Sequence, residues 1–136
     1  SLCYCDFLKT HTEPTMARIL VIEDEAAIRA NLLRFLRLEG HTPLEASNGR
    51  AGLDLALAER PDLIFCDLMM PLMTGNEVLA AIQLEPQLRA TPFFFLSASA
   101  EPELLERALQ MGASGYLTKP FSLAQLRAVL QHHVQV

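Results

Sequence analysis

The chain has 136 residues, of which 51% are hydrophobic, a length and composition that suit one domain with a core stable without disulfides. Its formal net charge of −5 and its lack of any Lys/Arg block argue against direct binding to a nucleic-acid backbone. The longest apolar stretches fall well short of the roughly 20 residues that a membrane-spanning helix needs. We therefore expect neither a membrane anchor nor an export signal.

The cysteines and the N-terminal residues point to a domain that begins at Met16. Cys3 and Cys5 lie near the start and Cys66 in an apolar run, so this odd count implies no disulfide framework and favours a reducing cytoplasm. Residues 1–15 show no sustained hydrophobic periodicity. We interpret them as a disordered leader or an added extension, with the folded domain at 16–136.

The first predicted element is a buried strand at 19–22, which is followed at once by the acids Glu23 and Asp24. From Ala26 the apolar residues recur at helical spacing with arginines between them, and Gly40 ends this pattern. The sequence thus predicts a strand that carries two carboxylates at its end and an amphipathic helix after it. Capping of that helix is the simplest structural role for either acid.

A weaker strand is predicted at 41–46. It carries Pro43, which cannot donate a hydrogen bond to a neighbouring strand, so we place it at an edge of the sheet. Asn48 and Gly49 then turn the chain into a second helix, which ends before Pro61.

The apolar run 63–71 is the centre of the pattern, because it lies between Pro61 and Pro71 and carries one acid, Asp67. A short, continuously apolar run predicts a strand buried on both faces, with Asp67 where the strand leaves the sheet. A carboxylate beside a packed sheet must be paired, solvated or bound to a metal ion. Asp67 is therefore the first candidate for a functional residue.

Two further strand and helix units complete the chain. Thr74 and Glu77 have the spacing of a capping box at the start of a helix, and the apolar strand 93–96 after it ends in Ser97. The next helix stops at Gly112. The last strand, at 115–117, leads to Lys119, and a second capping box at Ser122 and Gln125 opens the final helix.

This alternation predicts an α/β fold: a single doubly wound domain with a five-stranded parallel sheet and five helices. With the Pro43 strand at the edge, the strand order is 2-1-3-4-5, which is the flavodoxin-like order. Ligands then bind beyond the carboxyl ends of the first and third strands. The residues expected at this rim are Glu23, Asp24, Asp67, Ser97 and Lys119.

The residue types at this rim suit phosphoryl transfer with Mg²⁺. Three neighbouring carboxylates repel one another, so one of them stays protonated unless a cation neutralises the cluster. Mg²⁺ prefers oxygen ligands, whereas metals that need thiolate or imidazole find no suitable donors here. An ionised Asp67 can attack a phosphoryl group while Mg²⁺ and Lys119 stabilise the transferred charge. The product, an acyl phosphate, is labile to water and suits a signal of limited lifetime.

Over about residues 17–131 the chain resembles the receiver domain of the two-component response-regulator family. The likeness consists of short motifs at the ends of successive strands: Glu23-Asp24, Asp67 with Met70-Pro71 and Gly75, Ser97-Ala98, and Lys119-Pro120-Phe121. The acidic pair is Glu-Asp where the family also uses Asp-Asp, and Ser97 stands where Thr is frequent. Neither departure argues against the function.

The resemblance implies that Asp67 accepts the phosphoryl group and that Ser97 and Lys119 contact it. The implied Mg²⁺ ligands are Glu23, Asp24, Asp67 and the backbone carbonyl of Met69. A cis bond between Lys119 and Pro120 is also expected.

Tyr116 falls where the family keeps an aromatic switch residue. If the Ser97 hydroxyl turns toward the phosphoryl group, Tyr116 can fill the space it leaves, and the fourth helix, fifth strand and fifth helix present a changed face. This switch is a hypothesis.

The implied phosphoryl donor is a sensor histidine kinase or a histidine phosphotransfer protein, and the implied recipient of the signal is a downstream effector or output domain. The resemblance admits a phosphorylation-dependent homodimer, and no direct contact with nucleic acid or membrane is expected. Residues 1–136 contain no recognisable output domain beside the predicted receiver-like unit. The chain is therefore expected either to dock to partners by itself or to belong to a longer regulator or hybrid kinase.

Other interpretations stay open. Taken singly, Lys119 suits a surface lysine, Ser97 a turn residue and Tyr116 a core aromatic; only their joint placement favours a functional role for the first two.

A phosphate-independent module of the same fold is one alternative function. An aspartate-nucleophile phosphohydrolase is another, but it commonly needs an acid at the position of Met69, so we expect no turnover of an external substrate. A flavodoxin-like carrier is disfavoured because Glu23 and Asp24 would repel its phosphate.

Overall fold

The computed structural model describes residues 16–134, so the predicted disorder of residues 1–15 lies outside the described residues. Within this range, five strands alternate with five helices, as the sequence pattern predicts. The strands are β1 (Arg18–Ile22), β2 (Thr42–Ala46), β3 (Leu63–Asp67), β4 (Phe93–Ser97) and β5 (Gly115–Thr118). The helices are α2 (Ala26–Leu38), α3 (Gly49–Glu59), α4 (Gly75–Gln83), α5 (Pro102–Gln110) and α6 (Leu123–His133).

The strands form one parallel sheet in the order β2-β1-β3-β4-β5, which confirms the predicted order. Pro43 lies in the edge strand β2, as predicted, where its missing N–H is tolerated. The winding of the chain reverses between β1 and β3, and the carboxyl ends of these strands are the usual ligand site in such sheets. Because Glu23 follows β1 and Asp67 ends β3, the topology brings the two acids together.

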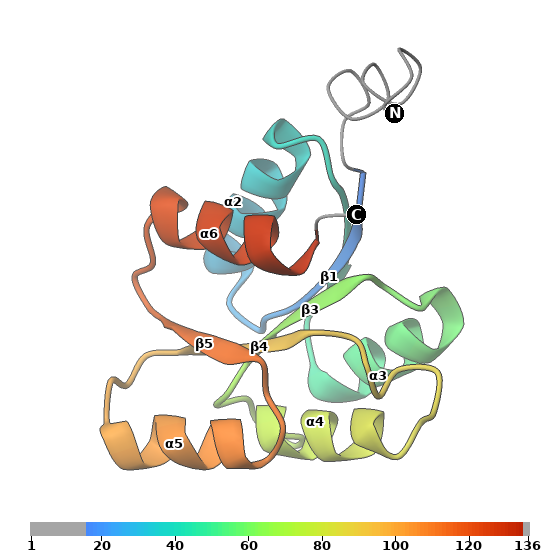
Figure 1. The fold of residues 1–136 in the computed structure, drawn as a ribbon, viewed down its shortest axis with the longest axis vertical. Coiled ribbons are helices and arrows are strands. Elements are labelled where there is room, and N and C mark those ends of the chain that lie inside the picture. The colour runs from blue at the N-terminus through green and yellow to red at the C-terminus, as the bar shows by residue number, and fades with distance from the viewer. Residues whose placement is uncertain (1–15, 135–136) are drawn as a thin grey trace, which may run out of the picture.

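The sheet is covered on both faces. Figure 1 shows α2 and α6 on one side and α3, α4 and α5 on the other. Successive side chains of β3 alternate between the two layers: Leu63 and Phe65 belong to the core beneath α2 and α6, and Ile64 and Cys66 to the opposite core. Burial on both faces explains why residues 63–66 of β3 are all apolar, with no alternation between apolar and polar side chains. None of the helices between residues 16 and 134 is long and apolar enough to cross a membrane.

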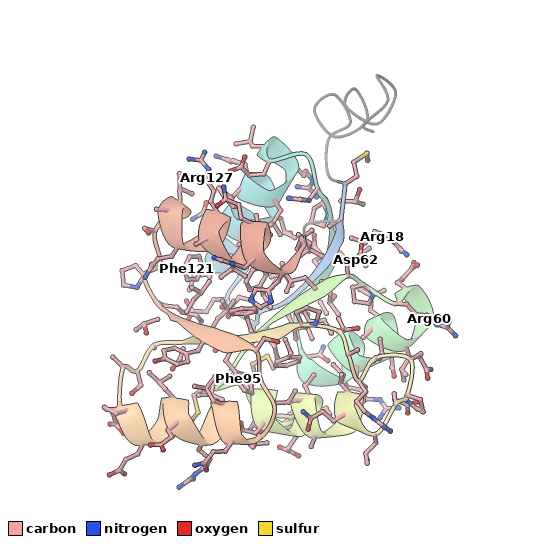
Figure 2. All side chains as sticks on the ribbon, viewed as in Figure 1. Arg18, Arg60, Asp62, Phe95, Phe121 and Arg127 are labelled. Carbon is pink, nitrogen blue, oxygen red and sulfur yellow. The ribbon has the colours of Figure 1, made fainter. Side chains whose placement is uncertain are left out.

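Side-chain contacts within each layer cover the two faces of the sheet away from the strand ends. Figure 2 shows Phe95 on the side of the sheet that faces α4 and α5. Its ring packs edge-on against the ring of Phe93, with 5.1 Å between the two ring centres. In the other layer, Arg127 on α6 forms an ion pair with Glu39 and lies 6.0 Å from the centre of the Phe35 ring of α2. The sheet is therefore fixed between two packed layers.

Both predicted capping boxes are present and fix the starts of α4 and α6. The Thr74 hydroxyl accepts a hydrogen bond from the Glu77 N–H at 3.3 Å, and the Glu77 carboxylate accepts one from the Thr74 N–H at 3.1 Å. Ser122 and Gln125 form the equivalent pair at 3.1 and 2.8 Å. These helices begin just after the loops that follow β3 and β5, so the caps also anchor those loops.

Candidate functional site

Three carboxylates meet at the carboxyl ends of β1 and β3. Glu23 and Asp24 come directly after β1, Asp67 is the last residue of β3, and one oxygen of each lies within 4.8 Å of the others. Glu23 is fully buried and Asp67 is 5% exposed, whereas Asp24 is exposed. The cluster therefore opens toward solvent at Asp24, and a small cation can reach the buried carboxylates from that side.

Lys119 faces the same cluster from the loop after β5. Its Nζ lies 2.6 Å from Glu23 Oε1 and 3.5 Å from Asp67 Oδ1, and its side chain is only 12% exposed. The simple interpretation of Lys119 as a surface lysine is therefore wrong. One ammonium group balances only one of the three carboxylates, so the site keeps a surplus of negative charge when all three are ionised.

The pKa values of Asp67 and Asp24 reflect this surplus of negative charge. Burial of Asp67, together with hydrogen bonding to Glu23 and Asp24, raises the pKa of its carboxyl group to about 7, although Lys119 acts in the opposite direction. Partial burial opposes the ionisation of Asp24, but hydrogen bonds with Asp67 and Glu23 outweigh it and lower the pKa of Asp24. The cluster thus holds a proton on Asp67 up to near-neutral pH, and a divalent cation would compete with that proton.

The ammonium group of Lys119 stays charged beside these acids. Its partial burial alone would lower the pKa, but the hydrogen bond to Glu23 and the charge of Asp67 raise the pKa of Lys119. Lys119 therefore supplies a fixed positive charge at the edge of the cluster.

The donor atoms at the site suit a hard divalent cation such as Mg²⁺. Glu23 Oε1 is buried and forms an ion pair of 2.6 Å with Lys119 Nζ. Such an oxygen retains capacity for a further cation. The nearby thiol of Cys66 is fully buried, which raises its pKa well above its usual value, so it offers no thiolate to a softer metal.

Met69 lies beside the cluster through its backbone. Its N–H donates a hydrogen bond of 3.3 Å to Asp67 Oδ1, and its side chain is exposed. The main chain of Met69 is therefore held next to Asp67. The role of its carbonyl group as a metal ligand remains a prediction.

Glu23 is held by contacts from several elements. Its N–H donates to the Ala46 carbonyl at 3.1 Å, its own carbonyl accepts from Arg29 Nη1 at 2.7 Å, and its Oε2 accepts from the Glu25 N–H at 3.2 Å. The residue at the N-cap of α2 is Glu25, so neither Glu23 nor Asp24 occupies the N-cap position of that helix. Sequence reasoning missed Arg29, which looked like any charged residue on the outer face of a helix.

Gly75 lets α4 begin directly against the end of β3. A Cβ atom at this position would lie 2.4 Å from the carbonyl oxygen of Asp67 and 2.9 Å from Leu68 Cα, both of which belong to the backbone. The Gly75 N–H also donates to the Leu68 carbonyl at 3.0 Å. This close approach gives a physical reason for glycine in the motif that follows Asp67.

Ser97 is almost completely buried at the end of β4. Its hydroxyl donates a hydrogen bond of 3.0 Å to the Ser99 carbonyl and accepts one of 3.1 Å from the Ser99 N–H, so it forms a local turn. The Lys119 N–H donates to the Ser97 carbonyl at 2.7 Å, which joins the loops after β4 and β5. The bond between Lys119 and Pro120 is cis, as expected.

Tyr116 is exposed and does not lie in the acidic cluster, so its interpretation as a core aromatic is wrong. It is in the edge strand β5, in register with Phe95, and therefore lies on the side of the sheet that α5 covers. Two other exposed apolar side chains lie on the helices before and after β5: Leu109 on α5 and Leu123 on α6. Any switching role of Tyr116 remains a prediction.

The site can now be compared with known proteins. Residues 19–131 match the sequence profile of the response regulator receiver domain. The chain belongs to this family. Receiver domains are signalling domains, and the resemblance predicted from the strand-end motifs is confirmed, as is the fold that it implied.

Relatives of known identity agree with this assignment. The transcriptional regulatory protein PdtaR of Mycobacterium tuberculosis is 39% identical over 110 residues, which are 80% of this chain and 52% of that protein. The chemotaxis protein CheY4 of Vibrio cholerae superposes with a TM-score of 0.82 at 34% identity, covering 87% of this chain and 98% of that one. The chain spans about half the length of the curated relatives it matches.

A third similar protein is the receiver domain of the sensor histidine kinase PA1611 from Pseudomonas aeruginosa. It superposes with a TM-score of 0.81 at 29% identity, covering 87% of this chain and 97% of that one. Its crystal structure has a magnesium ion coordinated in the active-site cleft.

Proposed function

We propose that this receiver domain accepts a phosphoryl group on Asp67 from a sensor histidine kinase or a histidine phosphotransfer protein. The proposed metal ligands are Glu23, Asp24, Asp67 and the backbone carbonyl of Met69, with Mg²⁺ as the cation. The observation that carries the proposal is the cluster of three carboxylates within 4.8 Å, with the ammonium group of Lys119 beside it. A structural ion pair needs no such surplus of acids.

The chemical step is an in-line displacement. A carboxylate oxygen of Asp67 forms a bond to phosphorus, and the bond between phosphorus and the imidazole nitrogen of the donor histidine breaks, with its electron pair passing to the imidazole. Lys119, whose Nζ lies 3.5 Å from Asp67 Oδ1, would stabilise negative charge on the transferred group. When bound, Mg²⁺ supplies further positive charge and favours the ionised form of the carboxylates.

Two observations support Mg²⁺ as the cation. The site offers oxygens from three neighbouring carboxylates, which are the ligands that Mg²⁺ prefers. The similar receiver domain of PA1611 binds magnesium in its active-site cleft.

The surroundings of Asp67 favour a domain that keeps the phosphoryl group over one that turns over an external substrate. The residue two positions after Asp67 is Met69, whose exposed side chain carries no proton for a leaving group. The acyl phosphate on Asp67 would then decay by slow reaction with water. We place the domain in the cytoplasm, where histidine kinases present their phosphoryl groups.

The same proposal includes a switch. Ser97 would exchange its hydrogen bonds with Ser99 for one to the phosphoryl group, and the loop from Ala98 onward would move with it. Tyr116 is exposed in the edge strand β5, on the side of the sheet that α5 covers. The partner-binding face would be formed by α5, β5 and α6. Amide exchange that is identical over residues 98–109 with and without a phosphate mimic would disprove this part.

The central test is labelling by a small acyl phosphate donor in the presence of Mg²⁺, followed by the mass of the intact protein. Wild-type protein should gain one phosphoryl group, and Asp67→Asn should gain none. The matched control is Asp54→Asn, because Asp54 is exposed on α3 and its one ion pair within residues 16–134 is with Arg50 on the same helix. Labelling of Asp67→Asn at the wild-type level would overturn the proposal and favour a phosphate-independent module.

A further inference from the structure

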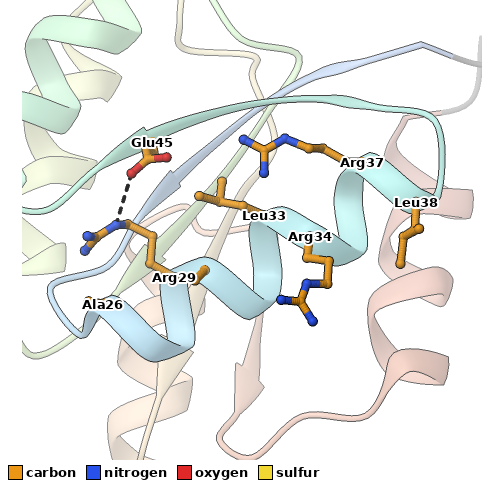
Figure 3. A pocket seen from close by; sticks show the side chains of 8 residues that line it. Ala26, Arg29, Leu33, Arg34, Arg37, Leu38 and Glu45 are labelled. Atoms are coloured by element: carbon orange, nitrogen blue, oxygen red, sulfur yellow. Dashed lines mark ion pairs between the residues drawn. The ribbon is translucent and has the colours of Figure 1, made fainter.

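Arg29 reaches from α2 back to the end of β1. Its Nη1 donates a hydrogen bond of 2.7 Å to the carbonyl oxygen of Glu23, and its Nε lies 3.4 Å from Glu45 Oε1 on the edge strand β2. Figure 3 shows the ion pair between Arg29 and Glu45, which joins α2 to β2. The planar guanidinium group makes both contacts at once, which a lysine cannot do in the same geometry.

The two contacts differ in strength. The Arg29 side chain is 17% exposed and the Glu45 side chain 53% exposed. Water screens the pair with Glu45, whereas the hydrogen bond to Glu23 is charge-assisted and shorter. Glu45 therefore orients Arg29, and the bond to Glu23 is the contact that matters for the loop.

That bond fixes the peptide group between Glu23 and Asp24. The N–H of Glu23 donates to the Ala46 carbonyl, and Arg29 holds the carbonyl group of Glu23. Asp24 follows this peptide directly, and its side chain is exposed. The orientation of the peptide consequently sets the direction in which the Asp24 carboxylate leaves the backbone.

We propose that Arg29 is a positioning residue for the cation site: by holding the Glu23 carbonyl, it keeps Asp24 and Glu23 in the arrangement that binds Mg²⁺. This inference rests on the proposed function, because it concerns the same acidic cluster. Arg29 itself is not a ligand, since a guanidinium group has no lone pair to offer.

For the replacement of Arg29, simple electrostatics and the positioning role predict opposite changes in Mg²⁺ affinity. Arg29 is a cation close to the site, so removing its charge would by itself strengthen the binding of Mg²⁺. Loss of positioning would instead weaken binding. The sign of the change in affinity therefore separates the two accounts.

The position of Arg29 makes it suitable for substitution. Its side chain lines a surface groove of about 610 Å³ between α2 and β2. Truncation would widen this groove and leave no closed cavity in the core, which limits the loss of stability. Arg34, on the same helix, is a matched control: it is exposed, points away from Glu45 in Figure 3, and makes no ion pair with the residues that the structure describes.

The experiment measures Mg²⁺ affinity of the full chain by calorimetry for the wild type, Arg29→Ala, Arg29→Lys and Arg34→Ala. We expect Arg29→Ala to weaken Mg²⁺ binding about 10-fold, as for the loss of one charge-assisted hydrogen bond, and Arg29→Lys about 3-fold. Arg34→Ala should bind like the wild type. The half-saturating Mg²⁺ concentration for labelling should rise in parallel, while the rate at saturating Mg²⁺ stays nearly unchanged.

A second measurement needs no metal. Amide exchange in the metal-free protein should become faster at residues 23–25 in Arg29→Ala and stay unchanged in Arg34→Ala. Unchanged or tighter Mg²⁺ binding by both Arg29 variants, beside a wild type that binds Mg²⁺ and is labelled, would overturn only the positioning role. A wild type that shows no saturable Mg²⁺ binding would overturn the metal site and this inference together.

Discussion

The two ends of the sheet use similar charged residues with opposite results. At the amino end, the Arg18 guanidinium lies 2.6 Å from the Glu59 carboxylate, and the Arg18 N–H donates to Asp62 at 2.8 Å. The side chains of Arg18 and Glu59 are 44% and 43% exposed, and Figure 2 shows Arg18 and Asp62 side by side at the surface. These charges are surrounded by water.

At the carboxyl end, the charges are buried and unequal. Lys119 stands against three acids, of which Glu23 and Asp67 are buried. The burial and the surplus of carboxylates raise the pKa of Asp67 to about 7.

This difference shows that burial and imbalance, not residue type, distinguish a site from a scaffold. An exposed ion pair contributes little to stability and can be lost without harm. A buried cluster with too few cations destabilises the fold until a cation or a proton arrives, and that same property makes it responsive to ligands. The following substitutions test the contrast, beginning with the largest expected effect.

Replacing Lys119 by methionine should have the largest effect, because it leaves the fully buried Glu23 without its ion-pair partner. We expect the free energy of unfolding in the absence of Mg²⁺ to fall by about 3 kcal/mol near neutral pH. Urea unfolding measures this, with Lys119→Arg as the variant that keeps the charge. A loss no greater than that of an exposed pair would mean that the two ends of the sheet do not differ as described.

Asp67→Asn should act in the opposite direction. A carboxyl group whose pKa is raised in the folded protein favours folding while protonated, and this contribution is lost as pH rises from about 4 through about 7. Without Mg²⁺, the variant should be more stable than the wild type by on the order of 2 kcal/mol at about pH 8.

The same difference should nearly vanish at about pH 3, which lies below the pKa of Asp67 in both the folded and the unfolded protein. Saturating Mg²⁺ should reduce it at the higher pH, since the cation relieves the repulsion among the acids. Thermal unfolding at both pH values provides the measurement. A wild type that gains stability relative to the variant as pH rises would contradict the raised pKa of Asp67.

Ser97→Ala should give a smaller effect that is confined to one loop. It removes both hydrogen bonds with Ser99, so we expect a loss of about 1 kcal/mol in the free energy of unfolding. Amide exchange should rise at Ser99. Ser97→Thr keeps the hydroxyl and serves as the control; equal exchange in the alanine variant and the wild type would show that the turn does not depend on this side chain.

The smallest effect is expected at the amino end of the sheet. Arg18→Met removes the pair with Glu59, but both partners are exposed, so the loss should be about 0.5 kcal/mol. The backbone N–H of residue 18 still reaches Asp62 in the variant. Mg²⁺ should not alter this difference, and a clear Mg²⁺ dependence would show that the two ends are coupled.

Much of the fold was predictable from local patterns. The short apolar run at β3 is buried on both faces, Pro43 lies at the edge of the sheet, and both capping boxes begin helices where expected. These features depend on a few neighbouring residues, and their physical causes act within one turn or one strand. The strand order followed from them because parallel strands with helical crossovers allow few arrangements.

Other features of the site could not be predicted in this way. The hydrogen bond from Arg29 to the Glu23 carbonyl joins two positions whose spacing carries no known signal. Its ion pair with Glu45 depends on how α2 lies against β2. The reason for Gly75 likewise appears only when the start of α4 is seen against the backbone of β3.

The sequence alone therefore told us that three acids, a lysine and a serine end neighbouring strands, since strand ends can be located from hydrophobic pattern and turn residues. Only the tertiary structure decided how these groups interact. It buries Glu23 and Asp67, leaves Asp24 open to solvent and brings one ammonium group to three carboxylates. Desolvation and close charge, which produce the raised pKa of Asp67, arise from packing between distant segments and have no local counterpart in the chain.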